Sequence, residues 1–130
     1  MSFSPPQYFT VKGKIVSGLG EGAKYIKLYR EQIRKTLGID PYPGTLNIDV
    51  EQDMSKVLPL DKAIIIPPPR AGYGIVYAFK ALLAKTEEVY VLKPAITTHS
   101  WRILEVISSY NLRRKLGLRD GVIVELTIMV

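Results

Sequence analysis

Two short stretches of this sequence carry residue types that bind phosphate groups and hard cations. The first is Gly18-Leu19-Gly20-Glu21-Gly22, where three of the five residues are glycine. Glycine can adopt a positive φ angle and lets a ligand approach the backbone closely, and successive exposed N–H groups can form an anion-binding concavity. The stretch therefore indicates an anion site, with a tight loop that binds no ligand as the alternative.

The second stretch, Thr45-Leu46-Asn47-Ile48-Asp49-Val50, alternates polar and apolar residues without a break. On a strand, this alternation places Thr45, Asn47 and Asp49 on one face. Mg²⁺ binds oxygen ligands and keeps several of its waters, so one or two protein oxygens are enough to hold it. Thr45 and Asn47, two residues apart, would direct two neutral oxygens to one point. A solvated sheet face is the alternative interpretation.

The glycine stretch matches neither of the common nucleotide-binding patterns, because it contains neither G-x-x-x-x-G-K-[ST] nor G-x-G-x-x-G. The residues on either side, 9–16 and 24–29, alternate with a period of two. We therefore expect the loop to join a strand over 8–16 to a second strand over 24–28. No helix N-terminus would then face the phosphates, and a nucleotide would bind on a β scaffold.

The period changes after residue 28. Tyr29, Ile33 and Leu37 recur every four residues, which predicts a short amphipathic helix with Gly38 as its left-handed cap. A turn rich in proline and glycine follows over 40–44. Further strands are expected over 63–66, with both faces buried, and then over 74–83, 88–92, 101–107 and 122–130.

The last third of the chain adds three features. Glu105 lies between two isoleucines on one strand face, so it lies at a barrel mouth or is buried with a partner, because an unpaired buried charge is costly. Residues 111–116 predict a short basic helix capped by Gly117, and Asp120-Gly121 predicts a hairpin turn. Six or more strands without βαβ alternation favour a closed or partly closed barrel.

Composition narrows the classes of partner and chemistry. The chain has 130 residues, which predicts one domain over 1–130 with a loose lead-in at 1–7. A net charge of +6 favours an anionic partner such as a nucleotide, a nucleic acid or an acidic surface. The absence of cysteine excludes disulfides, thiolate metal sites and a cysteine nucleophile. No apolar run reaches the roughly 18 residues of a membrane span, and no signal-peptide pattern is present, so we expect a cytoplasmic protein.

Three motifs stand in order along the chain: Ser17 to Gly22, Pro41 to Asn47, and Asn111-Leu112-Arg113 ahead of Leu118 to Gly121. Together they resemble the archaeal CTP-dependent riboflavin kinases, and the resemblance runs from about Val11 to Leu126. It implies a mostly β fold, namely a six-stranded cradle-loop (riboflavin-kinase-like) β-barrel with two or three short helices. It also implies transfer of the γ-phosphoryl group of CTP to the ribityl 5′-hydroxyl of riboflavin, giving FMN and CDP.

The resemblance also assigns site residues. It implies one Mg²⁺ ion on Thr45 and Asn47, and flavin contacts from Thr97 and Glu105. Glu105 is expected to accept a hydrogen bond from the flavin ring edge, with a role as general base as the alternative; no catalytic base is identified. The implied nucleotide-binding residues are Gly18, Leu19, Gly20, Glu21, Gly22, Ala23, Tyr110, Asn111, Leu112 and Arg113.

One position departs from the family pattern. Relatives often carry a basic residue where this chain has Ala23, so Lys24 is the candidate to supply that phosphate contact. The implied partners are CTP and CDP, together with riboflavin and FMN. We expect no nucleic acid, no membrane and a monomer.

Two other functions remain as alternatives. A small basic barrel similar to the swapped-hairpin transcription regulators would use the charge of +6 and the pattern over 116–121. Such a protein would bind nucleic acid with a steep salt dependence, and it would need neither the glycine stretch nor the Thr45 and Asn47 pair. A small apo-flavoprotein that stores FMN is the third possibility.

Overall fold

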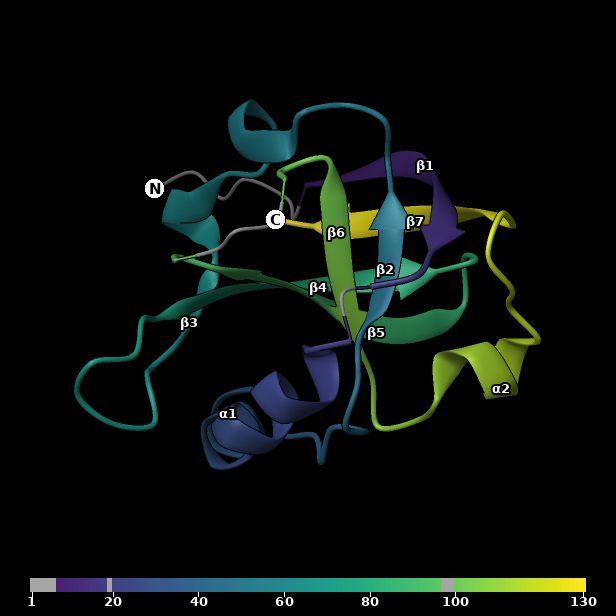
Figure 1. Cartoon of the computed structure of the whole chain (residues 1–130). Coiled ribbons are helices and arrows are strands. Elements are labelled where there is room, and N and C mark those ends of the chain that lie inside the picture. The colour runs from purple at the N-terminus through teal and green to yellow at the C-terminus, as the bar shows by residue number, and fades with distance from the viewer. Residues whose placement is uncertain (1–6, 19, 97–99) are drawn as a thin grey trace.

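The computed structural model of this chain describes residues 7–18, 20–96 and 100–130. Its strands are β1 (Tyr8–Val16), β2 (Leu46–Asp49), β3 (Ile64–Ile66), β4 (Val76–Leu83), β5 (Glu87–Pro94), β6 (Ile103–Ile107) and β7 (Ile123–Met129). They form one antiparallel sheet in the order β3-β4-β5-β6-β2-β1-β7, and β7 also pairs with β4 (Figure 1). All strands except β3 therefore close into a ring, and the predicted mostly β, six-stranded barrel is confirmed.

The short strand β3 lies outside this ring. It pairs with the first half of β4, where Ile66 lies opposite Val76, whereas β7 pairs with the second half of the same edge. Ile66 is buried, but Ile64 and Ile65 are 38% and 45% exposed. The expectation of a strand buried on both faces is wrong, because Ile66 packs against helix α1 (Gly22–Leu37) while Ile64 and Ile65 stay partly exposed.

The barrel interior is filled by the inward-facing residues of the alternating strands. Leu46 and Ile48 of β2 lie there with Leu104 and Val106 of β6, and all four are buried. The prediction that the apolar residues of the 45–50 stretch share one buried face is therefore confirmed. Because the strand alternates, Asn47 must point to the outer surface of the barrel.

The segment after the glycine stretch is one helix, α1 (Gly22–Leu37), so the strand expected over 24–28 is wrong. A strand would bury Ile26 and Leu28 together, but the structure buries Ile26, Tyr29 and Ile33, which have helical spacing, and leaves Leu28 exposed. The alternation over 24–29 was coincidental. The predicted cap is confirmed, since Gly38 has a φ of 74° and its N–H donates to the carbonyl oxygen of Arg34.

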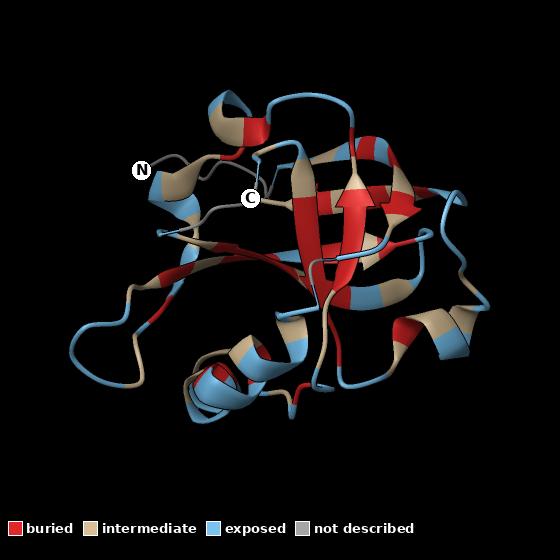
Figure 2. Cartoon of the chain, in the orientation of Figure 1, coloured by how far each residue is buried: buried red, intermediate tan, exposed pale blue. Residues whose placement is uncertain are grey.

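Helix α1 packs on the outside of the barrel and makes a second core layer. Its buried residues contact Ile66 of β3, Val76 and Ala78 of β4, and Leu92 of β5. Figure 2 shows the buried residues on the strands, while the outward side of α1 is exposed. The helix has 16 residues, so it is longer than the short helix predicted.

The second helix, α2 (Leu112–Leu116), follows the prediction closely. The side chain of Asn111 accepts a hydrogen bond from the N–H of Arg114 at 3.2 Å, and Gly117 is the left-handed cap. The turn at Asp120-Gly121 leads from α2 into β7, so the predicted hairpin is wrong, because the strand after this turn pairs with β1 and β4. Within the described ranges, no helix is long and apolar enough to cross a membrane.

Candidate functional site

A cavity of about 590 Å³ lies on the outer surface of the barrel, where the glycine stretch meets β2. Figure 1 shows the chain leaving β1, passing over β2 and entering α1 at this place. The walls come from segments far apart in the sequence: Ser17, Gly18, Gly20, Glu21, Gly22, Ala23, Tyr25, Gly44, Thr45, Asn47, Pro94, Ile96, Glu105 and Arg113. The predicted phosphate loop and the predicted oxygen pair therefore line one cavity.

The glycine stretch lies directly against the oxygen pair. A Cβ atom at Gly18 would overlap the Nδ2 atom of Asn47, and one at Gly22 would lie 2.7 Å from Oγ1 of Thr45. Gly20 has a φ of 81°, and a Cβ atom there would meet no atom within 4 Å in the described part of the chain. Two of these glycines are thus required for close approach and the third for its backbone conformation.

The first turn of α1 opens into this cavity, since Gly22 and Ala23 line it. Among the described residues, no side chain caps this helix end, and its first turn contains no acidic residue. The first N–H groups of a helix have no acceptor within the helix, and the helix dipole favours an anion there. The expectation that no helix N-terminus faces the phosphates is therefore wrong. Leu19 lies outside the described residues.

Asn47 of β2 and Glu105 of β6 are direct partners across the sheet, and both are buried at the cavity wall. The Oδ1 atom of Asn47 is buried and has no hydrogen-bond partner within the described ranges. Leaving a buried acceptor unpaired costs about 1–3 kcal/mol. This acceptor oxygen, without a partner in the described part of the chain, lines one cavity with Thr45 and therefore suits a hard cation that takes oxygen ligands.

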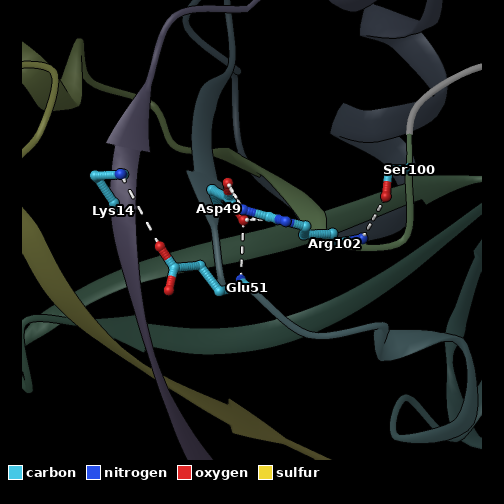
Figure 3. A network of polar contacts seen from close by, with 5 residues as sticks. All are labelled: Lys14, Asp49, Glu51, Ser100 and Arg102. Carbon is cyan, nitrogen blue, oxygen red and sulfur yellow. Dashed lines mark hydrogen bonds and ion pairs between the residues drawn. The ribbon is translucent and has the colours of Figure 1, made fainter.

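The third polar residue of the β2 face does not join this pair. At the far end of β2, Nε and Nη2 of Arg102 donate to the Asp49 carboxylate at 2.7 and 3.0 Å, and the N–H of Glu51 donates to it at 2.9 Å. Figure 3 shows this network, in which Lys14 also lies 4.0 Å from Glu51. Asp49 therefore ties the end of β2 to the residue that precedes β6.

The apolar part of the cavity wall contains residues that the sequence interpretation missed, namely Tyr25, Pro94 and Ile96. Burial, with smaller contributions from Tyr29 and Glu105, raises the pKa of Tyr25, so its phenol stays protonated. Its hydroxyl is buried and finds no hydrogen-bond partner among the described residues. The helical spacing of Ile26, Tyr29 and Ile33 was the signal in the sequence. A helix that begins at Gly22 carries Tyr25 in its first turn, next to the glycine stretch.

A smaller pocket of about 170 Å³ adjoins the cavity, and the two share Gly44, Thr45 and Arg113. Its remaining walls are formed by Tyr42, Leu46, Val106, Ser108, Tyr110, Asn111 and Leu112. The Nδ2 atom of Asn111 donates to the hydroxyl of Tyr42 at 3.1 Å. The structure thus brings the predicted nucleotide segment 110–113 next to the glycine stretch, although the two are far apart in the sequence.

One sequence expectation, the phosphate contact of Lys24, lies away from the two pockets. Lys24 is exposed on α1 and is not among the described residues that line the two pockets. Thr97 lies outside the described residues. Within the described ranges, no group of three or more histidine, cysteine, aspartate or glutamate side chains could hold a metal ion. A cation here would therefore need the neutral oxygens of Thr45 and Asn47 together with oxygens of its ligand.

The antiparallel barrel holds a glycine loop, an open helix N-terminus and an oxygen pair around one cavity, and this arrangement suits the binding of phosphate groups and a cation. The sequence comparisons give the family. The family model named CTP-dep_RFKase, described as a domain of unknown function (DUF120), matches residues 15–128. The chain belongs to this family, the CTP-dependent riboflavin kinases.

Individual relatives agree with the family assignment. A riboflavin kinase of Staphylothermus marinus is 57% identical over 118 residues, covering 91% of this chain and 90% of the relative. One of Sulfurisphaera tokodaii is 40% identical over 127 residues, covering 91% and 93%. One of Pyrobaculum islandicum is 42% identical over 135 residues, covering 94% of this chain and 64% of the relative. The resemblance to archaeal kinases is thus confirmed.

Proposed function

We propose that this protein transfers the γ-phosphoryl group of CTP to the ribityl 5′-hydroxyl of riboflavin, giving FMN and CDP. The observation that supports this most directly is the contact of Gly18 with Asn47 and of Gly22 with Thr45. This close approach supports the proposal, because the residues suited to phosphate and those suited to a cation line one cavity.

Phosphoryl transfer needs positioning and charge neutralisation more than covalent chemistry. The N–H groups of residues 18–23 and the N-terminus of α1 would bind the phosphates, and Arg113 would add a positive charge from α2. The nucleotide would continue into the smaller pocket along residues 110–113. Because Arg113 lines both pockets, it is suited to the junction between them.

Kinases generally require a divalent cation, and we propose one Mg²⁺ ion held by Thr45 and Asn47. The buried Oδ1 atom of Asn47, which has no hydrogen-bond partner among the described residues, suits a bond to this ion. When bound, the ion supplies neutralisation of the charge on the phosphate oxygens. The protein's own part is to hold the two neutral oxygens close together, with Asn47 on β2 and Thr45 directly before it.

We propose that the flavin occupies the side of the cavity formed by Tyr25, Pro94 and Ile96, with contacts from Thr97 and Glu105. Apolar walls suit an aromatic ring system, and a carboxylate at the wall can accept a hydrogen bond from the ring edge. Glu105 is also the direct partner of Asn47, which keeps the general-base role as the second candidate.

The test incubates the protein with riboflavin and Mg²⁺, with CTP, ATP, GTP or UTP in parallel, and looks for FMN by chromatography. FMN with CTP alone is the expected result. FMN with ATP would keep the kinase and overturn the nucleotide assignment. No FMN with any donor, together with salt-sensitive binding to DNA, would favour the nucleic-acid alternative.

The domain extent, the oligomeric state and the cellular location stay predictions. We infer one kinase domain over 1–130, a monomer, and a cytoplasmic location. The absence of cysteine is compatible with a reducing compartment. Size-exclusion chromatography with light scattering measures the oligomeric state, and a dimer would overturn the prediction of a monomer.

A further inference from the structure

Asp120 holds two residues of the proposed nucleotide site at once. Its Oδ1 atom accepts a hydrogen bond from Nη2 of Arg113 at 2.6 Å, and its Oδ2 atom accepts one from the hydroxyl of Ser17. The same Nη2 atom donates to the carbonyl oxygen of Val16 at 3.2 Å. One carboxylate thus connects the end of β1 with α2 and with the turn that leads into β7.

The turn that carries Asp120 is fixed to β1 by the backbone. The N–H of Gly121 donates to the carbonyl oxygen of Ile15 at 2.8 Å, and the N–H of Ile15 donates to that of Val122 at 2.9 Å. The carboxylate is therefore held on an anchored turn. In the sequence, the pattern over 116–121 was also compatible with a nucleic-acid-binding protein. In the structure, Asp120 of this pattern binds Ser17, the residue before the glycine stretch.

Asp120 can affect the cavity through Ser17 and Arg113, whose side chains both donate to it. Ser17 and Arg113 line the larger cavity, whereas Asp120 is not among the described residues that line either pocket. The hydrogen bonds from Ser17 and then Arg113 hold the pKa of the Asp120 carboxyl below its usual range, so it is ionised at neutral pH. Because a guanidinium is a rigid planar fork, fixing Nη2 also fixes the direction of the other donors.

We infer that Asp120 is a positioning residue of this kinase: it directs the Arg113 guanidinium and holds Ser17 at the start of the glycine stretch. This rests on the proposed function, which assigns Arg113 and the glycine stretch to the nucleotide. Gly18 follows Ser17 directly and leaves no space against Asn47. A displacement of Ser17 would therefore reach the oxygen pair as well as the phosphate loop.

The geometry also predicts which property depends on Asp120. The side chains of Arg113 and Asp120 are 38% and 53% exposed, and exposed ion pairs contribute little to stability. Removing the charge should therefore leave folding nearly unchanged. The effect should appear in nucleotide binding, because the freed Arg113 and Ser17 would no longer be held in one arrangement.

The experiment compares wild type with Asp120→Asn, Ser17→Ala and the double variant. It measures steady-state kinetics with CTP and riboflavin, and calorimetric titration of CDP. We expect Asp120→Asn to raise KM for CTP and Kd for CDP about tenfold, with KM for riboflavin within about twofold. Ser17→Ala should raise the nucleotide constants about threefold, and the double variant should match Asp120→Asn, because both residues act through one carboxylate.

Asp40→Asn is the matched control. Asp40 accepts two hydrogen bonds from Arg30 at 2.9 and 3.0 Å, its side chain is 59% exposed, and it lines neither pocket of the site. This variant should leave the nucleotide constants unchanged. If Asp120→Asn leaves KM for CTP within about twofold of wild type, or raises both KM values equally, the inference is overturned. If wild type forms no FMN, the proposed function fails, and the CDP titration alone then decides the role of Asp120.

Discussion

Asn47 and Glu105 lie opposite each other on β2 and β6, and their buried side chains line the same cavity. The residue proposed for the cation and the residue proposed for the flavin are therefore neighbours across one pair of strands. A cation and a flavin bound as proposed would therefore contact adjacent strands of one sheet.

The oxygen pair should be needed for turnover and not for folding. We expect Thr45→Ala and Asn47→Ala each to lower kcat about 10²-fold or more, because electrostatic stabilisation of the transferring group is lost. Since Oδ1 of Asn47 has no protein partner within the described ranges, Asn47→Ala should keep the fold. Kinetics and thermal unfolding measure the two effects.

Thr127→Ala is a suitable control for the threonine variant. Thr127 shares a hydrogen bond of 3.0 Å with the hydroxyl of Thr10 on the exposed surface between β1 and β7. Its removal should leave kcat unchanged. Full activity in both Thr45→Ala and Asn47→Ala would refute the assignment of the metal site.

Substitution of Gly18 in the glycine stretch and of Gly38 at the end of α1 should be harmful for different reasons. Gly18→Ala introduces a Cβ atom against Nδ2 of Asn47, so we expect loss of most activity and about 1–3 kcal/mol of stability through overpacking. Gly38→Ala is the comparison, since Gly38 has a φ of 74° with no described atom within 4 Å of a built Cβ. It should cost about 1 kcal/mol through backbone strain and leave kcat intact. Equal activity losses in both variants would contradict the packing argument.

Kinetics can distinguish the two possible roles of Glu105, flavin binding and general-base catalysis. If its carboxylate binds the flavin ring edge, Glu105→Gln should raise KM for riboflavin about tenfold and preserve kcat. If it is the general base, kcat should fall about 10²–10⁴-fold and the acidic limb of the pH–rate profile should disappear. We expect the first result. Glu88→Gln, at an exposed position on β5, serves as the control.

The Asp49–Arg102 pair should make stability depend on pH. The hydrogen bond from Arg102 is the largest cause that lowers the pKa of Asp49 in the folded protein, relative to about 3.9 in an unfolded chain. The pair therefore stabilises the fold above about pH 4, and this contribution is lost as the pH falls through the lower, folded pKa.

Asp49→Asn tests this sign. The variant should be about 1 kcal/mol less stable than wild type at pH 7, and the difference should shrink at acidic pH, as the folded Asp49 carboxyl becomes protonated. Urea unfolding at the two pH values measures it. A difference that is larger at the acidic pH would contradict the assignment.

Local features of this chain could be predicted because local chemistry decides them. Gly38 and Gly117 end their helices because glycine adopts the left-handed conformation that closes a helix. Strand β2 buries Leu46 and Ile48 because successive side chains of a strand point to opposite faces, and the apolar face is the one that packs inside the barrel. The order of the motifs predicted the family, since residues 17–22, 41–47 and 111–121 carry its pattern.

Tertiary contacts decided the rest. Residues 24–29 alternate like a strand, but they are helical because Ile26, Tyr29 and Ile33 are buried together against strands that come later in the chain, including β3, β4 and β5. That non-local contact also points a helix N-terminus into the cavity. The partnership of Asn47 with Glu105, and the link from Asp120 to Ser17 and Arg113, likewise arise from strand pairing and barrel closure. Local sequence sets conformational preferences, whereas burial against distant segments selects among them.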